Sequence, residues 1–573
     1  MNCSNKFKLT AIAMMVGTTM NAQAALYQVV EVSPQDHGSN GDYQTAYGVA
    51  IQQGDAGTDP STGSPFALGC FDAAANCTLD QFKLAMETRT TPISATQAVD
   101  GNSYREEIPF GLDARFDYTQ ELIDFERYCD NQLGYSTCRT WAKENWEPWG
   151  KEKSKDFTSN ALAFVEADAN AYANEYNNVI NHLTESGAAV GNQSIVSKSD
   201  TSTLETRNTV VAPVKPNLTA DNAASVVQSH AWKTDGTFTV GSVSRTASNT
   251  NGAHHTSKAA IWDQSGTVSE LAWPSGTSKD GEKLAQGSMR DLVTDGTTVY
   301  GVGYNTYRDD NYLNATVFVG TLEAEGSVEN ATWKNKVVVG ARQREGDDRV
   351  HTNSRLTDVN SNFVAIGEAK RRVATAGAYP NRLFIVDDVR KDSINAFYPS
   401  SGIFFSGAGG KMGGINSYNE IVGQLDAETT REDDGKPRRK RGFIYPYSVG
   451  GETSERASTL FNGKAWFLDN LTNGGDYSEQ NNQFRIIDAT DINDAGVISG
   501  TAMKCAGGYS TTANNATCSS DEQIVAVKLV PIAGATEKDI VSRSVDSTTT
   551  ERQGAGLGWL ALTMLGLFGF RRK

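Results

Sequence analysis

The chain has 573 residues and a formal net charge of −16. This length suits one large β domain with an insertion, or two to three smaller domains. The negative charge disfavours nucleic-acid binding, which usually requires a basic face, and it is typical of a solvated secreted protein. The 54 glycines, together with frequent Asn, Asp, Ser and Thr, indicate short strands joined by many turns.

Residues 1–24 have the pattern of a secretory signal peptide. Lys6 and Lys8 precede an apolar stretch, and Ala22 and Ala24 have the A-x-A spacing of a cleavage site. We therefore expect signal peptidase to act on the exported chain.

Cysteine usage agrees with export. Cys3 lies in the signal peptide, and an even number of cysteines in the exported part favours disulfides. Close spacing suggests local pairing, although six cysteines allow fifteen connectivities. A zinc site is the alternative, but no Cys-x-x-Cys is present and no His lies near any pair. The expected pairs are Cys70 with Cys77, Cys129 with Cys138, and Cys505 with Cys518.

Composition changes between residues 113 and 186. Residues 116–125 and 161–183 have helical spacing of apolar residues and good helix formers. We expect a helical insert here, closed by the Cys129–Cys138 loop. Its tryptophans form a small core of their own, with a sugar-binding platform as the alternative. The flanking segments are interpreted as N-terminal strands of the β domain (25–112) and as a linker or long loop (187–224).

A repeat organises residues 225–532. Each copy has an apolar residue, a turn rich in Asn, Asp and Gly, a short apolar strand and a final Gly, which is the pattern of a β-hairpin. The copies are 491–500, 414–423, 358–367, a looser 291–301, and 234–241, which keeps only the later half. The turn and strand-end residues that we single out are Asn360, Gly367, Asn416, Gly423, Asn493, Gly496 and Gly500.

A second apolar strand follows most copies, so that the unit recurs about every sixty residues. Sheets at such spacing are typical of propeller blades. We therefore expect an all-β fold: a β-propeller-like domain of six or seven blades with the helical insert outside it. Strands near 26–32 and 47–51 complete one blade in this interpretation. A series of β-sandwiches or a β-solenoid is the alternative.

No catalytic motif is present: we find no HExxH, Gly-x-Ser-x-Gly, Walker loop or dinucleotide fingerprint. Residues 491–496 resemble half a calcium loop, but Ala495 and Ala502 stand where an EF-hand needs ligands. We expect no catalytic, cofactor-binding or metal-binding residues. Weak extracellular calcium binding by the acidic loops 345–348 and 432–434 is the alternative.

One basic run, 436–441, interrupts the acidic chain. We interpret it as a loop that faces the acidic residues 432–434. A docking patch for an anionic surface polymer is the alternative.

The C-terminus has three successive parts. Residues 533–553 are interpreted as a polar stalk, and the apolar run 557–570 ends in three cations. As a helix the run would span about 21 Å, less than the hydrocarbon core of about 30 Å. The cations favour a cytoplasmic end. An ordinary single-pass anchor is one interpretation of residues 554–573.

This tail also resembles the GlyGly-CTERM sorting signal, with Gly554, Ala555 and Gly556 at the Gly-rich motif. Ala555 departs from the glycine of that family. The resemblance implies cleavage near these residues by a rhombosortase-type intramembrane protease. It also implies transient inner-membrane residence, type II secretion, and a final location at the surface or outside of a Gram-negative cell.

The repeat resembles the HAF-type extracellular repeat, whose units carry Ile-Asn-x-x-Gly-x-Val-x-Gly and then a strand like His-Ala-Phe-Leu-Trp. Residues 491–500 and 414–423 match the first part, and residues 229–232 are similar to the second. With its tail, the whole chain is similar to domain-of-unknown-function family 3466 of marine Gram-negative bacteria. That family has no assigned activity, so the resemblance implies architecture and location only.

We therefore expect an exported surface or secreted β-repeat protein that binds or structures something and is not an enzyme. A surface polysaccharide or a protein is the expected ligand class. The alternative is an exported hydrolase with carboxylates at the mouth of a propeller. Unlike carboxylates and a base gathered in one channel would favour the hydrolase, and similar acidic turns in every blade would favour the binder.

Overall fold

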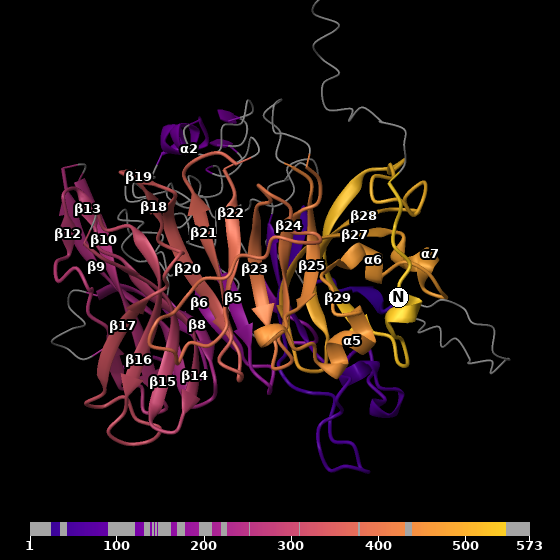
Figure 1. Ribbon diagram of the computed structural model, residues 1–573, viewed down its shortest axis with the longest axis horizontal. Helices are drawn as coiled ribbons and strands as arrows, with labels where there is room; N and C mark the ends of the chain where they lie inside the picture. Colours follow the sequence, from indigo (N-terminus) through magenta and orange to yellow (C-terminus); the bar gives the residue numbers. More distant parts are fainter. Residues whose placement is uncertain are drawn as a thin grey trace, which may run out of the picture.

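The computed structural model describes residues 25–34, 43–89, 121–130, 138–139, 142–143, 146, 162–168, 178–193, 209–218, 226–250, 252–308, 310–375, 379–429 and 438–545. In this part of the chain the strands run side by side (Figure 1). They form a seven-bladed β-propeller, so the predicted all-β propeller is confirmed and the blade number is the higher of the two expected.

Each blade is an antiparallel sheet, and the chain moves outward from the axis as it passes through the strands of a blade. Blades 1 and 2 are β2 (Thr45–Ile51), β3 (Leu84–Arg89) and β4 (Leu162–Val165), then β5 (Asn178–Leu183), β6 (Ala189–Gln193) and β7 (Thr209–Val211). Blade 3 is β8 (Val226–Thr234), β9 (Phe238–Asn249), β10 (Gly252–Asp263) and β11 (Val268–Glu270). Blade 4 is β14 (Gly287–Asp295), β15 (Thr298–Thr306), β16 (Leu313–Thr321) and β17 (Thr332–Val337).

The remaining blades follow the same order. Blade 5 is β20 (His351–Val359), β21 (Ala365–Arg371) and β22 (Asn381–Val386). Blade 6 is β23 (Gly410–Ile415), β24 (Glu420–Asp426), β25 (Lys440–Pro446) and β26 (Trp466–Phe467). Blade 7 is β27 (Phe484–Ile492), β28 (Ile498–Cys505), β29 (Glu522–Pro531) and, as its outer strand, β1 (Tyr27–Glu31).

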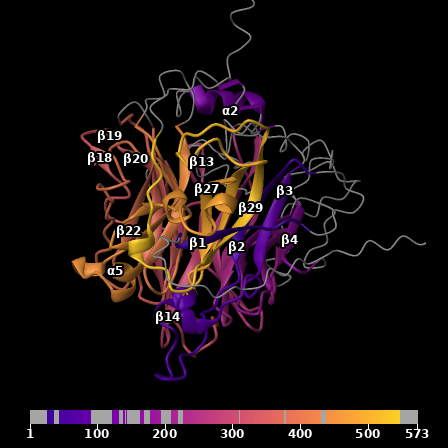
Figure 2. The same ribbon diagram turned by 90° about the vertical axis from the view of Figure 1, so that its right-hand side faces the viewer.

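The first and last described strands close the ring. β1 pairs antiparallel with β29, with Tyr27 opposite Pro531, and Figure 2 shows the indigo strand beside the yellow ones. The first strands of neighbouring blades contact one another all the way round, including β27 with β2. The sequence placed 26–32 and 47–51 in one blade. The structure instead assigns β1 to blade 7 and β2 to blade 1.

Short elements mark the two faces of the propeller. At the upper end in both views lies α2 (Leu122–Tyr128), with the hairpin β18 (Arg344–Glu345) and β19 (Asp348–Arg349). A second hairpin there is β12 (Lys279–Asp280) and β13 (Lys283–Leu284). At the lower end lies α5 (Glu455–Phe461). The shorter helices are α6 (Leu468–Leu471), α7 (Ser478–Asn481) and the 3-10 turns Gly69–Phe71, Ala73–Ala75, Val449–Gly451 and Glu537–Asp539.

The segment that carries α2 leaves blade 1 between β3 and β4, but it packs on blade 4. Phe125 and the Cys129–Cys138 disulfide lie against Tyr304 and Leu313, at the ends of β15 and β16 that face α2. Trp146 packs against the same cluster. Because blades 2 and 3 lie between blades 1 and 4, α2 packs on a blade that is not adjacent to the one from which its segment comes.

Two sequence assignments are wrong. Residues 161–183 were expected to be helical, but β4 and β5 lie in that range. The interval 187–224 was expected to be a linker, but it contains β6 and β7 of blade 2. The helix formers in these segments are overridden because strand pairing and burial decide the structure; all four residues of β4 are buried.

The predicted stalk is also wrong for its described part. Arg543 is 5% exposed, and its guanidinium donates to Asp469 O at 2.7 Å and to Thr512 O at 2.9 Å. Residues up to 545 are therefore attached to blades 6 and 7 and do not form a free stalk at this point.

Candidate functional site

A β-bulge occurs at the same place in the first strand of every blade. In each case the pairing register to the second strand shifts by one residue, as between Leu356 and Asp358 or between Ala489 and Asp491. The equivalent shifts occur in the other five blades. We call the residue just after the bulge the ring position. The seven ring residues, in chain order, are Ala50, His182, Lys233, Asp291, Asp358, Gly414 and Asp491.

Lys233, the ring residue of blade 3, forms ion pairs with the ring residues of blades 4 and 5. Its Nζ lies 3.0 Å from Asp291 Oδ2 and 2.5 Å from Asp358 Oδ1. The two aspartates are 3% and 8% exposed, whereas Lys233 keeps 25% of its side-chain surface accessible. Because blade 4 lies between blades 3 and 5, the Lys233 side chain must pass blade 4 on the side that faces the propeller axis. The ring side chains therefore point toward the propeller axis.

The ring carboxylates also bind the main chain of the following blade. Asp291 Oδ2 accepts from Val359 N at 2.9 Å, and Asp358 Oδ2 accepts from Ile415 N at 2.9 Å. Asp491 repeats this contact across the closure, where its Oδ2 accepts from Ile51 N at 3.1 Å. Each ring aspartate therefore joins its own blade to the next one.

Burial and mutual charge set the protonation of the ring. Burial, assisted by the charge of Lys233, lowers the pKa of His182 to about 3, so that this imidazole is neutral at pH 7. Burial opposes the charge of Lys233, but the surrounding aspartates raise its pKa overall.

The aspartates divide into two kinds. Burial raises the pKa of Asp491 to about 7 and raises that of Asp291 well above its usual value. For Asp358 burial acts in the same direction, but Lys233 and several hydrogen bonds outweigh it and lower the pKa.

The raised pKa of Asp491 predicts a pH dependence of stability. The stability contributed by a group with a raised folded-state pKa is complete below its unfolded pKa of about 3.9 and is lost as pH rises through the folded value. For Asp491 that loss runs up to about pH 7. The unfolding free energy of the wild type should fall as the pH rises from about 5 to 8. We expect this fall to be smaller in Asp491→Asn, by on the order of 2 kcal/mol. Urea denaturation across this range measures it.

Asp358→Asn is the matched control, because the pKa of Asp358 is lowered. Its contribution is present above pH 4 and is lost only in acid, so this variant should be destabilised throughout the same range. Parallel pH profiles for the wild type and Asp491→Asn would contradict the assignment.

The repeat asparagines form a second set of links between blades. The Asn360 side chain donates to Asn416 O at 2.8 Å, and that of Asn416 donates to Asn493 O at 3.2 Å. Asn493 continues the series with a 2.9 Å bond to Gln52 O, and Gln52 donates to Glu185 O at 2.7 Å. Blades 5, 6, 7, 1 and 2 are thus joined through their turns.

The same asparagines fold their own turns. Asn360 Oδ1 accepts from Val364 N at 3.0 Å, and Asn493 Oδ1 accepts from Val497 N at 2.9 Å. Gly496 has a φ of +87°, which favours glycine at this turn. An amide side chain that both accepts and donates explains why the repeat carries Asn here.

The final glycine of the repeat lies opposite the bulge, where the first strand approaches closely. A Cβ at Gly241 would stand 1.7 Å from His230 O, and one at Gly367 would stand 2.4 Å from Arg355 O. The corresponding residues of blades 6 and 7 are Gly423 and Gly500. In blade 4 this place belongs to Gly303 and not to Gly301, where the predicted copy ended.

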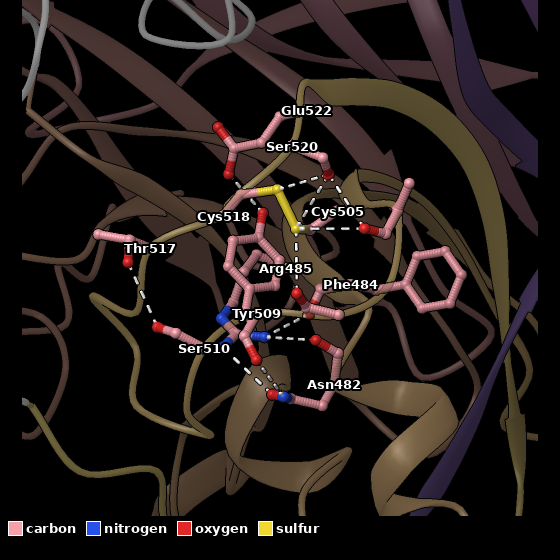
Figure 3. The surroundings of a disulfide bond; sticks show 12 residues. Asn482, Phe484, Arg485, Cys505, Tyr509, Ser510, Thr517, Cys518, Ser520 and Glu522 are labelled. Carbon is pink, nitrogen blue, oxygen red and sulfur yellow. Dashed lines mark hydrogen bonds between the residues drawn. A yellow bond between two sulfur atoms is a disulfide. The ribbon is translucent and has the colours of Figure 1, made fainter.

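All three predicted disulfides are present: Cys70–Cys77, Cys129–Cys138 and Cys505–Cys518. The third closes a loop beside Arg485, which Figure 3 shows together with Tyr509. Arg485 donates to Ala513 O at 3.0 Å and stacks on Tyr509 at 4.1 Å from the ring centroid. The Cys505–Cys518 disulfide therefore closes a loop whose carbonyl oxygens accept hydrogen bonds from buried guanidinium groups.

Lys440 and Arg441 of the basic run belong to β25, and the acidic residues 432–434 that the run was expected to face lie outside the described residues. Arg438 and Arg441 are each 5% exposed. Arg438 donates to Gly407 O at 2.7 Å, and Arg441 lies 2.9 Å from Asp469. These two residues are held within the fold and do not form a free docking patch.

Several predicted residues cannot be placed, because Ala22, Ala24, Gly554, Ala555 and Gly556 lie outside the described residues. Within the part of the chain that is described, no helix is long and apolar enough to cross a membrane. In that same part, no three His, Cys, Asp or Glu side chains are grouped in a way that could hold a metal ion.

The ring was not recognised as a set from the sequence, because its seven members belong to five residue types and only Asp recurs, in blades 4, 5 and 7. One signal was available for blade 2. Leu183, Gly187, Val190 and Gly191 repeat the spacing of the known copies, and Gly187 has a φ of +79° in the turn between β5 and β6. This copy lay inside a segment that had been interpreted as helix and linker.

The comparisons with known proteins identify a family and no activity. No curated protein matches the chain. Among solved structures, an inulosucrase from Halalkalicoccus jeotgali bound to kestose is similar with 9% identity and a TM-score of 0.24, covering 75% of this chain and 91% of that chain. At that TM-score the likeness supports no inference. The family described as "Protein of unknown function (DUF3466)" matches residues 221–573, more than half of the sequence, and the chain belongs to that family.

Proposed function

We propose that this protein is an exported, non-enzymatic propeller that binds or structures material at the cell surface or outside the cell. Its HAF-like repeats serve as the scaffold, and its GlyGly-CTERM-like tail directs sorting. A surface polysaccharide is the ligand class that we favour. The partners in export are signal peptidase, a rhombosortase-type protease and the type II secretion machinery, with transient residence in the inner membrane.

One observation carries the proposal of a non-catalytic role. Both oxygens of each ring aspartate already accept hydrogen bonds from the protein. Asp291 Oδ1 accepts from Leu292 N at 2.7 Å and Asp491 Oδ1 accepts from Ile492 N at 2.9 Å. Their Oδ2 atoms, and both oxygens of Asp358, face Lys233 or the next blade. Carboxylates used in this way hold blades together. Three disulfides favour an oxidising location.

A binding and turnover assay tests the role. Purified protein is incubated with polysaccharide extracted from the surface of the producing cells. Co-sedimentation measures binding, and chromatography measures released oligosaccharides. We expect retention on the polymer without product. Absence of binding to every surface fraction, or product formation by the wild type, would reject the proposal.

An exported hydrolase remains the second candidate because one observation favours it. Asp358 has a lowered pKa, whereas Asp491, another ring residue, has one raised to about 7. Two carboxylates of unlike protonation are the arrangement that acid–base hydrolysis requires. This candidate predicts product release that Asp491→Asn abolishes.

The sorting proposal gives a prediction about the mature ends. We expect protein recovered from the medium or cell surface to lack residues 1–24 and to end near Gly554–Gly556, as measured by intact mass. A helix of about fourteen apolar residues is a poor permanent anchor, and glycines at its outer end are easily unwound for cleavage. Replacing Gly554 and Gly556 by Leu should retain the chain in the inner membrane. A mass that includes Arg571 to Lys573 would indicate a plain anchor.

A further inference from the structure

The rim between blades 4 and 5 brings three basic side chains to one face of blade 5. His351 on β20 pairs with Arg371 on β21, and Arg382 on β22 pairs with Ala369. Residues 369 and 371 share a face because side chains alternate along a strand, so Arg371 and Arg382 are diagonal neighbours across two strands. His351, Arg371 and Arg382 therefore lie side by side.

Tyr398 fixes the geometry of this group. His351 stacks on its ring, with centroids 5.5 Å apart and planes at 26°. The Arg382 guanidinium carbon lies 4.1 Å from the centroid of the same ring. The Tyr398 hydroxyl donates to Gly340 O at 3.0 Å, in the segment that follows blade 4. The two basic groups are thus held in place by an aromatic side chain that is itself anchored.

Among the described residues, no carboxylate pairs with either arginine. Neither Arg371 nor Arg382 has an ion pair in that part of the chain, and the side chain of Arg371 donates only a long 3.4 Å bond to Val373 O. Two other arginines of blade 5 are paired: Arg390 binds Asp388 at 2.9 Å, and Arg355 approaches Glu368 at 3.4 Å. Two uncompensated guanidinium groups at one place are unfavourable unless an anion accompanies them.

The electrostatic state of the group agrees with this geometry. Burial lowers the pKa of Arg382 below its usual value; Tyr398 acts in the opposite direction, and repulsion from Arg371 adds to the lowering. Burial and the charges of Arg382 and Arg371 lower the pKa of His351 to about 4, so this imidazole is neutral. Its Nε2 is buried and has no hydrogen-bond partner among the described residues, although the residue is only 2% exposed. Such an unsatisfied buried nitrogen is unusual.

We propose that Arg371 and Arg382 form a binding site for an oxyanion, with His351 at its inner edge. A carboxylate, sulfate or phosphate group matches paired guanidinium groups in charge and in hydrogen-bond geometry. The identity of the natural ligand rests on the proposed function: the anion would be the charged group of an acidic surface polysaccharide. Free inorganic sulfate or phosphate presents the same chemistry.

Thermal unfolding in sulfate tests the site without any knowledge of the polymer. A ligand that binds only the folded state raises the unfolding midpoint as its concentration increases. At constant ionic strength, we expect replacement of chloride by sulfate to raise the midpoint of the wild type. Arg371→Gln and Arg382→Gln should each weaken the sulfate response about tenfold or more, since each removes a charge-assisted contact.

Arg390→Gln is the matched control, because Arg390 belongs to the same blade but is already paired with Asp388. It should keep the full sulfate response. The proposal is overturned if all three variants respond like the wild type, or if the wild type shows no response to sulfate or phosphate beyond that to chloride. Arg382→Gln also removes the stacking on Tyr398, so Arg371→Gln, which leaves it intact, gives an independent result if the other variant fails to fold.

A second arm distinguishes the source of the anion. The wild type and Arg371→Gln are compared for retention on an acidic polysaccharide and on the same polymer after chemical removal of its charged groups. A glycan-borne anion is supported if retention is lost both when Arg371 is replaced by Gln and when the charged groups are removed from the polymer. If the wild type binds sulfate but is not retained on the polymer, the site binds a free anion. That result would support the oxyanion site and reject the polysaccharide as its ligand.

Discussion

Replacing Lys233 by Met should destabilise the protein by about 3–5 kcal/mol at pH 7, the largest effect of a charge change that we expect in this fold. The variant leaves Asp291 and Asp358, which are 3% and 8% exposed, without the ammonium that lies between them. Two buried carboxylates without a counter-ion can remain folded only by taking up protons. Chemical denaturation monitored by tryptophan fluorescence measures the loss.

The same variant should recover stability in acid. Removal of Lys233 raises the folded-state pKa of both aspartates, so the penalty is small below about pH 4 and grows as pH rises. Lys504→Met is the control: its partner is Glu31, and both side chains are more than a quarter exposed. That pair should contribute at most about 1 kcal/mol, with little dependence on pH. A Lys233→Met variant as stable as Lys504→Met at pH 7 would refute the ring as a central support.

Gly241→Ala should cost about 3 kcal/mol or more, although it adds a single methyl group. The new Cβ would stand 1.7 Å from the carbonyl oxygen of His230 and 2.7 Å from its carbonyl carbon. Both atoms belong to the main chain of β8, which cannot move without breaking its bulge. Thermal unfolding and the yield of folded protein measure this effect.

Gly409→Ala is the comparison for this substitution. It also adds a methyl group to blade 6 at an ordinary φ, but the nearest atoms lie 3.4 Å away. We expect a change within about 0.5 kcal/mol. Equal stabilities of the two variants would show that β8 relaxes freely and that the glycine opposite the bulge is dispensable.

Much of the architecture could be predicted because every repeat needs the same turn and the same close approach between strands. Asn416 and Asn493 fold a turn and bind the next blade with one side chain, so their chemistry recurs in the sequence. Gly367 and Gly500 recur because a Cβ would meet a carbonyl. Blade 2 was missed because β5 lies in a stretch with many Ala and Glu residues, whose helical propensity is overridden by strand pairing, and because β6 lies in a polar interval interpreted as a linker.

The ring could not be predicted in the same way. Its seven members belong to five residue types, and Lys233 meets Asp358 only because their strands lie two blades apart around a closed axis. The oxyanion group has a similar origin: Arg382 is one of many arginines in the sequence, and only the structure shows which of them have no ion pair among the described residues. Spacing along the chain predicts contacts within a blade, whereas contacts across the axis depend on closure.

The pairing of β1 with β29 also constrains the order of folding. Tyr27 and Pro531 lie at opposite ends of the described chain, yet they are cross-strand partners in one sheet. A chain made from its N-terminus must keep β1 unpaired until β29 has emerged, and the entropy of closing so long a loop makes this a late step. Until then the outer edge of blade 7 presents unpaired backbone groups that could recruit another chain. Delivery of an unfolded polypeptide across a membrane, with both ends arriving before the ring closes, is compatible with this topology.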